Sequence, residues 1–132
     1  MIPKFRFYNI KLRTIYKVIN VDLYNEQVDC LLEKQYSDVI TWDIKDGVLM
    51  QSTGLKDKNG KEIFEEHIVE FKNPYDKRNK TRGTIVWRED KACFGIDMEG
   101  TTEQFELYRI TAENYLTVIG NKFEDGYLLE SY

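Results

Sequence analysis

The chain has 132 residues, of which 42% are hydrophobic, 32% are charged and 14% are aromatic, and its formal net charge is −4. This composition fits one small globular domain, with or without an extension, whose core needs neither a metal ion nor a disulfide. The acidic balance argues against a domain that binds DNA tightly without sequence preference. No apolar run approaches the ~20 residues of a membrane-spanning helix.

Three runs near the start of the chain alternate apolar and polar side chains, at residues 4–8, 15–21 and 28–33. A period of two residues is typical of strands, and β-branched and aromatic residues dominate all three runs. Tyr24-Asn25-Glu26 is expected to connect the second run to the third. We therefore predict an antiparallel meander over roughly the first 35 residues.

The pair Asn59-Gly60 predicts a hairpin turn between two halves of the segment from Leu49 to Val69. Asn-Gly favours a two-residue type I′ turn, because both central residues of that turn need a positive φ. Asp46-Gly47 is a second turn pair, and we place a soft boundary between an extension, residues 1–48, and a core domain, residues 49–132. No linker composition marks this boundary, so one continuous domain remains the alternative.

Short strands separated by polar connections are expected beyond Glu66. The candidates are His67 to Lys72, Gly83 to Glu89, Cys93 to Met98, Gln104 to Leu107 and Tyr115 to Asn121. Their number and order are similar to an SH3-like five-stranded β-barrel, an analogy of pattern that does not fix function. Helix is expected only as single turns, at Thr111 to Asn114 with the threonine as cap and at Gly126 to Glu130. The predicted fold class is mainly β.

Residues that carry catalysis or bind metals are scarce. His67 is the only histidine and no C-x-x-C occurs, which removes the usual zinc patterns. We predict no catalytic residue, no metal ligand and no cofactor, and we interpret His67 as a rim residue at a sheet edge. Cys30 and Cys93 are expected to be reduced thiols in the core. Basic residues interrupt the apolar runs of the first segment, so we expect no secretory signal and a cytoplasmic location.

Charge is distributed unevenly along the chain. A basic loop follows Lys72, and acids gather in the segment that contains Asp97, Glu99, Glu103 and Glu106. An aromatic residue flanked by cations is how small β-barrels hold single-stranded nucleic acid, whereas a charged loop is more often only solvated. Trp87 is expected to be a core residue rather than a stacking platform. The candidate residues for binding nucleic acid or a partner are Tyr75, Lys77, Arg78, Lys80 and Arg82.

Four segments together resemble the YopX-type proteins of bacteriophages and prophages: MIPKFRFYN at the start, LMQSTGLKDKNGKEIF from Leu49, GTIVW from Gly83 and TVIGNKFED from Thr117. The resemblance implies a mainly β fold and no settled activity. Two departures stand out. The family usually has Glu-Gly-Asp-Ile-Val after Phe64, where this chain has Glu65-Glu66-His67-Ile68-Val69, and the family's Asn-Pro-Glu near the end is replaced by Asp125-Gly126-Tyr127.

Three functional hypotheses follow. The favoured one is a non-enzymatic β-barrel adaptor that binds a phage or host protein through a groove or a strand edge, with self-association as an open alternative. The second is an accessory factor that binds nucleic acid through the basic loop. The third is an enzyme whose site is assembled from residues distant in sequence. None of the three implies contact with a membrane.

Overall fold

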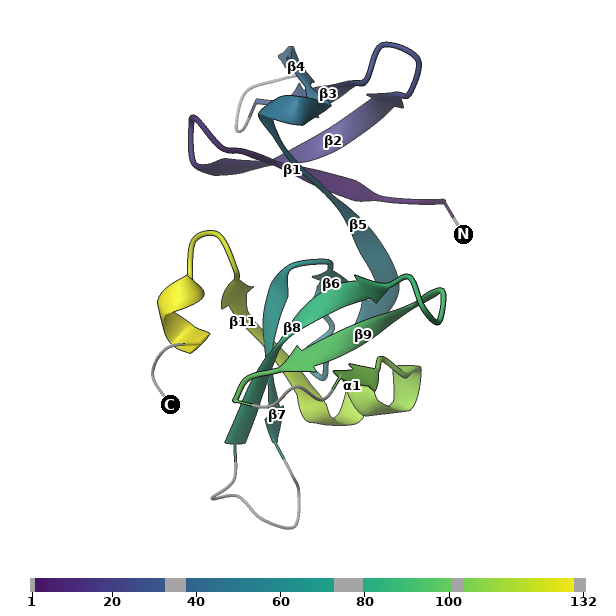
Figure 1. Ribbon diagram of the computed structural model, residues 1–132, viewed down its shortest axis with the longest axis vertical. Helices are drawn as coiled ribbons and strands as arrows, with labels where there is room; N and C mark the ends of the chain where they lie inside the picture. Colours follow the sequence, from purple (N-terminus) through teal and green to yellow (C-terminus); the bar gives the residue numbers. More distant parts are fainter. Residues whose placement is uncertain (1, 33–37, 73–79, 101–103, 130–132) are drawn as a thin grey trace. The chain divides into compact units, whose positions relative to one another are not determined.

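The computed structural model describes residues 2–32, 38–72, 80–100 and 104–129. The described chain is mainly β, with two antiparallel sheets and short helices (Figure 1). It divides into two compact units, residues 1–52 (unit 1) and residues 53–132 (unit 2). The strand β5 (Gly47–Lys56) begins in unit 1 and ends in unit 2, and the soft boundary expected from the sequence falls within it.

Unit 1 is an antiparallel meander continued by β5. Its other strands are β1 (Phe5–Asn9), β2 (Thr14–Asp22), β3 (Gln27–Leu31) and β4 (Val39–Asp43), and a 3₁₀ turn, η1 (Ile44–Asp46), precedes β5. The sheet order is β4-β3-β2-β1-β5-β6. The three predicted N-terminal strands are confirmed, and β4 was not predicted.

The inward face of unit 1 forms a small aromatic core. Phe7, Val28 and Cys30 are fully buried, because alternate residues of β1 and β3 point to the same side of the sheet. Trp42 of β4 packs on Phe7 and Tyr16, with ring centroids 6.2 and 4.6 Å apart. Burial raises the pKa of the Cys30 thiol to about 11, and the charge of Asp29 adds to the effect. Cys30 is thus the core thiol expected, whereas Cys93 is only half-buried.

The predicted hairpin is present, but its turn type differs from the prediction. β5 is joined to β6 (Glu62–Phe64) through residues 57–61, and only Gly60 of the Asn59-Gly60 pair has a positive φ, +82°. Gly60 donates to the Asp57 carbonyl at 3.0 Å, and Asp57 donates to the Lys61 carbonyl at 2.8 Å. This is a three-residue loop in which the glycine takes the left-handed position. A type I′ turn would also place Asn59 at positive φ.

The carboxylate of Asp57 explains why the longer loop is preferred. Asp57 is 4% exposed, and its Oδ1 accepts from the backbone N–H groups of Asn59 and Lys61, both at 2.9 Å. Its Oδ2 accepts from the N–H of Val118, also at 2.9 Å, from a strand 61 residues further along the chain. Lys58 donates to the Leu116 carbonyl at 3.0 Å. The hairpin loop is therefore bonded directly to β11 (Leu116–Asn121).

Unit 2 holds a five-stranded antiparallel sheet with the order β10-β9-β8-β7-β11. Besides β11, its strands are β7 (His67–Lys72), β8 (Lys80–Arg88), β9 (Cys93–Met98) and β10 (Gln104–Glu106). All five predicted strands are confirmed. In the part of the chain that the structure describes, β10 and β11 are the two edges and the sheet does not close on itself, so the SH3-like barrel is not confirmed.

The core of unit 2 lies on one face of this sheet. Ile63, Val69, Ile85, Ile96, Ala112, Leu116 and Val118 are buried together. Each large aliphatic side chain buried here contributes about 1.5 to 3 kcal/mol. The helix α1 (Arg109–Tyr115) places Ala112 in this cluster.

Helix occurs near the two predicted places. α1 begins before Thr111, and its N-cap is Tyr108 with no side-chain cap, so the predicted threonine cap is wrong. Arg109 and Glu113 form an exposed ion pair at 3.3 Å along the helix. The second prediction corresponds to a 3₁₀ turn, η2 (Gly126–Leu129).

His67 is a buried residue of a central strand, which corrects its interpretation as a rim residue. It is 3% exposed, and β7 lies between β8 and β11. Its Nδ1 accepts the backbone N–H of Phe64 at 3.0 Å and closes the turn between β6 and β7. Glu66 in that turn has a φ of 69°. Glu66 thus adopts the conformation that suits the family's glycine, and His67 supplies a side-chain acceptor in the place of the family's aspartate.

Replacing Asp57 tests the link between the hairpin and β11. We expect Asp57→Ala to lower the free energy of unfolding by about 3 kcal/mol, because buried N–H groups lose their acceptor. Urea titration gives this value. Asp22→Ala is the control, since Asp22 also accepts from two backbone N–H groups, at 3.1 and 3.0 Å, but these hydrogen bonds are exposed, so water can replace the carboxylate. Equal losses in the two variants would contradict the structural role of Asp57.

A second pair of variants tests the acceptor at position 67. His67→Leu leaves the Phe64 N–H unpaired, whereas His67→Asn keeps a side-chain acceptor on the same turn. We expect the leucine variant to be less stable than the asparagine variant by about 1 to 2 kcal/mol, although leucine is the more apolar residue. The measurement is again urea titration. A leucine variant as stable as the asparagine variant would show that the hydrogen bond has no structural weight.

Candidate functional site

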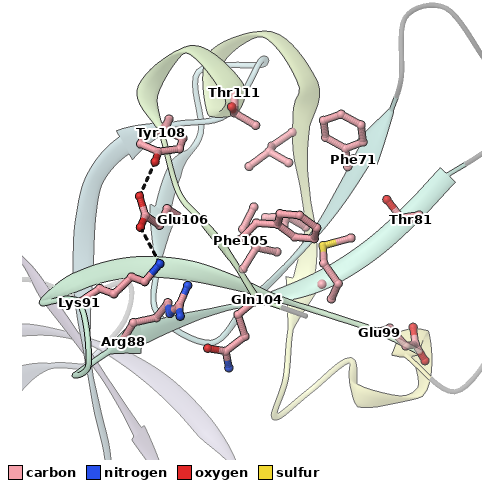
Figure 2. A pocket seen from close by; sticks show the side chains of 15 residues that line it. Phe71, Thr81, Arg88, Lys91, Glu99, Gln104, Phe105, Glu106, Tyr108 and Thr111 are labelled. Carbon is pink, nitrogen blue, oxygen red and sulfur yellow. Dashed lines mark hydrogen bonds and ion pairs between the residues drawn. The ribbon is translucent and has the colours of Figure 1, made fainter. Parts of the chain in front are cut away.

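Unit 2 contains a cavity of about 720 Å³ beside its sheet. Strands β7, β8, β9 and β10 contribute side chains to its lining, and so do α1 and the start of β11 (Figure 2). Its apolar lining is Val69, Phe71, Ile96, Met98, Phe105 and Leu116. Volumes of 300 to 1,000 Å³ with mostly apolar walls are typical of ligand sites. The cavity is thus large enough to receive another molecule.

Local sequence explains why these side chains point into the cavity. Val69 and Phe71 alternate with Glu70 along β7, and Ile96 and Met98 alternate with Asp97 along β9. Gly83 of β8 has no side chain, and a Cβ there would lie 2.6 Å from Ile96 Cγ2 and 3.2 Å from Met98 Sδ. The missing side chain lets the two residues of β9 lie across β8.

Polar side chains gather at one end of the cavity. Lys91 Nζ lies 3.3 Å from Glu106 Oε1, and the hydroxyl of Tyr108 donates to Glu106 Oε2 in a short hydrogen bond (Figure 2). Arg88 lines the same end, and its Nη2 lies 3.1 Å from Oδ2 of the exposed Asp90.

The hydrogen bond between Tyr108 and Glu106 moves both pKa values away from neutrality. The pKa of Glu106 is lowered, first by this bond and then by Lys91, and the pKa of Tyr108 is raised by the same carboxylate. Glu106 therefore stays ionised and Tyr108 stays protonated throughout the neutral range. A general acid or base works best with a pKa near the operating pH, so this pair is better suited to hydrogen bonding than to proton transfer.

Glu99 and Thr81 also line the cavity, and Figure 2 places them away from the Lys91–Glu106–Tyr108 chain. Glu99 follows β9, whose first residue, Cys93, pairs with Arg88. Glu106 pairs with Gly95 of β9, so along this strand the two polar ends are four residues apart, about 13 Å at ~3.3 Å per residue.

Of the site residues predicted from the sequence, Arg82 is the one whose side chain the structure describes, and it does not line this cavity. Tyr75, Lys77 and Arg78 lie outside the described residues, as does the side chain of Lys80. Arg82 is half-buried on β8, with its Nε 3.3 Å from Glu70 Oε2 and its Nη1 donating to the Leu128 carbonyl at 2.8 Å. These contacts give Arg82 a structural role, and nucleic-acid binding by the loop stays a prediction.

Sequence reasoning missed the residues that line the polar ends. Glu99 and Glu106 belong to the acidic segment that the sequence marks, but nothing in their spacing shows which acids face inward. Trp87 is 45% exposed and packs edge-on against Phe94 at 5.0 Å, so the expectation of a core tryptophan is wrong. The alternation of Glu106 and Tyr108 was the available signal, because both lie on one side of an extended segment.

No group of three His, Cys, Asp or Glu side chains in the described ranges is placed to hold a metal ion. None of the described helices has the length and apolar character needed to cross a membrane.

Residues 4–130 match the YopX protein family. The chain belongs to this family. A crystal structure of protein EF1440 from Enterococcus faecalis is similar to it, with a TM-score of 0.66 and 24% identity over 98% of this chain and 99% of that one. At this identity the likeness supports the family's fold and nothing further. No curated protein matches the sequence.

The pKa of Glu106 provides a test of the polar end. We expect Tyr108→Phe to raise the Glu106 pKa toward its ordinary value, because the phenol that favours the carboxylate is lost. Carbon-13 NMR of the labelled carboxyl group during an acid titration measures it. Lys91→Gln should raise the same pKa as well, since Lys91 lowers it both through its hydrogen bond and through its charge. An unchanged Glu106 pKa in Tyr108→Phe would contradict the hydrogen bond.

Proposed function

We propose that the protein is a non-enzymatic interaction module of bacteriophages and prophages that works in the bacterial cytoplasm. In this proposal, unit 2 binds an apolar segment of a phage or host protein in its cavity. The observation that supports it is the cavity of about 720 Å³ with six apolar side chains in its walls. An apolar surface of that kind gains most from a partner that removes it from water.

The chemistry of the polar groups supports binding over catalysis. Glu106 and Tyr108 have pKa values shifted away from neutrality in opposite directions, whereas an acid–base pair is tuned toward the working pH. Lys91 and Tyr108 already satisfy the Glu106 carboxylate. Fixed, mutually bonded groups at a cavity rim orient a ligand and give it specificity.

Two tryptophan substitutions on α1 form a matched test. Thr111 lines the cavity, so the large side chain of Thr111→Trp would take up space in it, whereas Ile110 is 73% exposed and absent from the cavity wall. We expect Thr111→Trp to lower partner retention at least about tenfold, since a group excluded from a buried pocket costs about 2 kcal/mol or more. Ile110→Trp should retain the partner.

The measurement is affinity capture of the tagged protein from phage-infected cells, with and without nuclease, followed by binding of the purified partner. Thermal unfolding of each variant establishes that it is folded. Retention after nuclease by the wild type and by Ile110→Trp supports the proposal. Release of all partners by nuclease would favour the basic loop and nucleic acid instead, and equal retention by both tryptophan variants would place the contact outside the cavity.

A further inference from the structure

The strand β4 is an edge of the six-stranded sheet and pairs with β3 alone. Two flanking hydrogen bonds show which of its backbone groups face β3. Leu32 donates to the Asp38 carbonyl and Ile44 donates to the Glu26 carbonyl, both at 2.9 Å. In an antiparallel pair every second residue directs its N–H and C=O toward the partner strand. The even-numbered residues of β4 therefore bond to β3, and the residues that direct these groups outward are Val39, Thr41 and Asp43.

The other sheet edges of the described chain are shorter or already bonded. β6 and β10 have three residues each, whereas β4 has five. The edge of β11 is bonded to the hairpin loop through Val118 and Leu116. For the outward backbone groups of β4, the described ranges supply no hydrogen-bond partner. β4 is thus the longest open strand edge in the part of the chain that the structure covers.

β4 also lacks the features that usually block an edge strand. Natural edges are protected by lysine, by proline, by a bulge or by a covering segment. β4 reads VITWD, and its register with β3 is continuous. Val39 is 48% exposed, and Ile40 and Trp42 are only half-buried although they pack on the aromatic core of unit 1. A strand paired with β4 would remove these apolar side chains from water.

A second copy of β4 complements the first. Antiparallel pairing about a two-fold axis at Thr41 sets each Val39 opposite Asp43 of the other copy, so that all three outward positions are matched. Ile40 of one copy then lies opposite Trp42 of the other on the core face, because alternate residues share a face. The register that pairs Asp43 with itself matches only one outward position within the strand. It also sets two carboxylates opposite each other, which is destabilising.

We infer that two copies of the chain associate through β4 in the register centred on Thr41. The pairing supplies about six backbone hydrogen bonds, two for each matched pair of residues. A contact of this two-fold kind uses the same edge of both copies and therefore closes at a dimer. The inference goes beyond the proposed function, since it concerns unit 1 and the cavity lies in unit 2.

A proline substitution at the outward edge tests the pairing. The φ of Asp43 is −72°, which a proline ring can adopt, and the N–H of Asp43 points away from β3. Asp43→Pro therefore removes one outward donor from each copy and leaves the bonds to β3 in place. Asp43→Ala is the matched control, because both variants lose the carboxylate that accepts from Gln27 at 3.3 Å, but only the alanine keeps the N–H.

Sedimentation equilibrium gives the dissociation constant of the dimer, and thermal unfolding establishes that each variant is folded. We expect Asp43→Pro to raise this constant at least about tenfold, since each dimer loses two hydrogen bonds, and Asp43→Ala to leave it nearly unchanged. Equal constants for the two variants would overturn the inference. A wild-type chain that stays monomeric up to about 1 mM, the weak end of the affinity scale, would overturn it too and leave the edge to a strand of a different protein.

Cysteine cross-linking tests the register and does not depend on the proline variant. In the inferred pairing, the two copies of residue 41 face each other at about 5.5 Å between Cα atoms, which a disulfide can span. The two copies of residue 39 are offset by four residues, about 13 Å, which is too far. Thr41→Cys and Val39→Cys are each made with Cys93→Ser, because Cys93 is half-buried whereas Cys30 is fully buried.

Mild oxidation followed by non-reducing electrophoresis measures the cross-linked fraction. We expect Thr41→Cys to form a covalent dimer and Val39→Cys to remain a monomer. Equal cross-linking of the two variants would contradict the register. A wild-type dimer in which neither variant cross-links would place the contact elsewhere and overturn the inference. None of these outcomes affects the proposed function, which the tryptophan variants of α1 test separately.

Discussion

The carboxylate of Asp57 joins two parts of unit 2 that are far apart in sequence. Its two oxygens accept three backbone N–H groups, two in the hairpin loop and one at Val118 in β11. β11 follows α1 without a connecting loop, because α1 ends at Tyr115 and β11 begins at Leu116. Fixing Val118 therefore also fixes the end of the helix. Thr111 and Leu116, which form one wall of the cavity, are held in place by this arrangement.

The strands were predictable because period-two alternation is a local property. The runs around Phe7, Val18 and Cys30, and all five strands of the second sheet, were recognised from it. The turn at Asn59-Gly60 was assigned to the wrong type because Asp57, two residues earlier, competes through bonds to the loop and to Val118. The Val118 N–H that binds Asp57 lies 61 residues away in the sequence. Turn preferences consider only neighbouring residues, so they could not include this hydrogen bond. Barrel closure is likewise a property of distant pairing, and strand count alone could not decide it.

The candidate site was less predictable than the fold. Charge clustering led to the basic loop, of which the structure describes the side chain of Arg82, bound to Glu70 and the Leu128 carbonyl. The cavity depends on where the core of unit 2 ends, and on Gly83 and Gly95, whose missing side chains make room for Met98 and for the stem of Arg88. A glycine inside a strand often marks a place where a neighbouring group approaches the backbone closely, and this signal was available in the sequence. Which neighbours approach is known only once the strands are paired.

The central claim is that the folded protein keeps an accessible apolar cavity beside Met98. Proton–carbon NMR of methionine methyl groups tests it most directly, because the chain has only three methionines and benzyl alcohol serves as a small apolar probe. Met98 lines the cavity, whereas Met50 is fully buried in unit 1. The account predicts a saturable shift of the Met98 signal while the Met50 signal stays in place. An unmoved Met98 signal, or equal shifts of both signals, would contradict it.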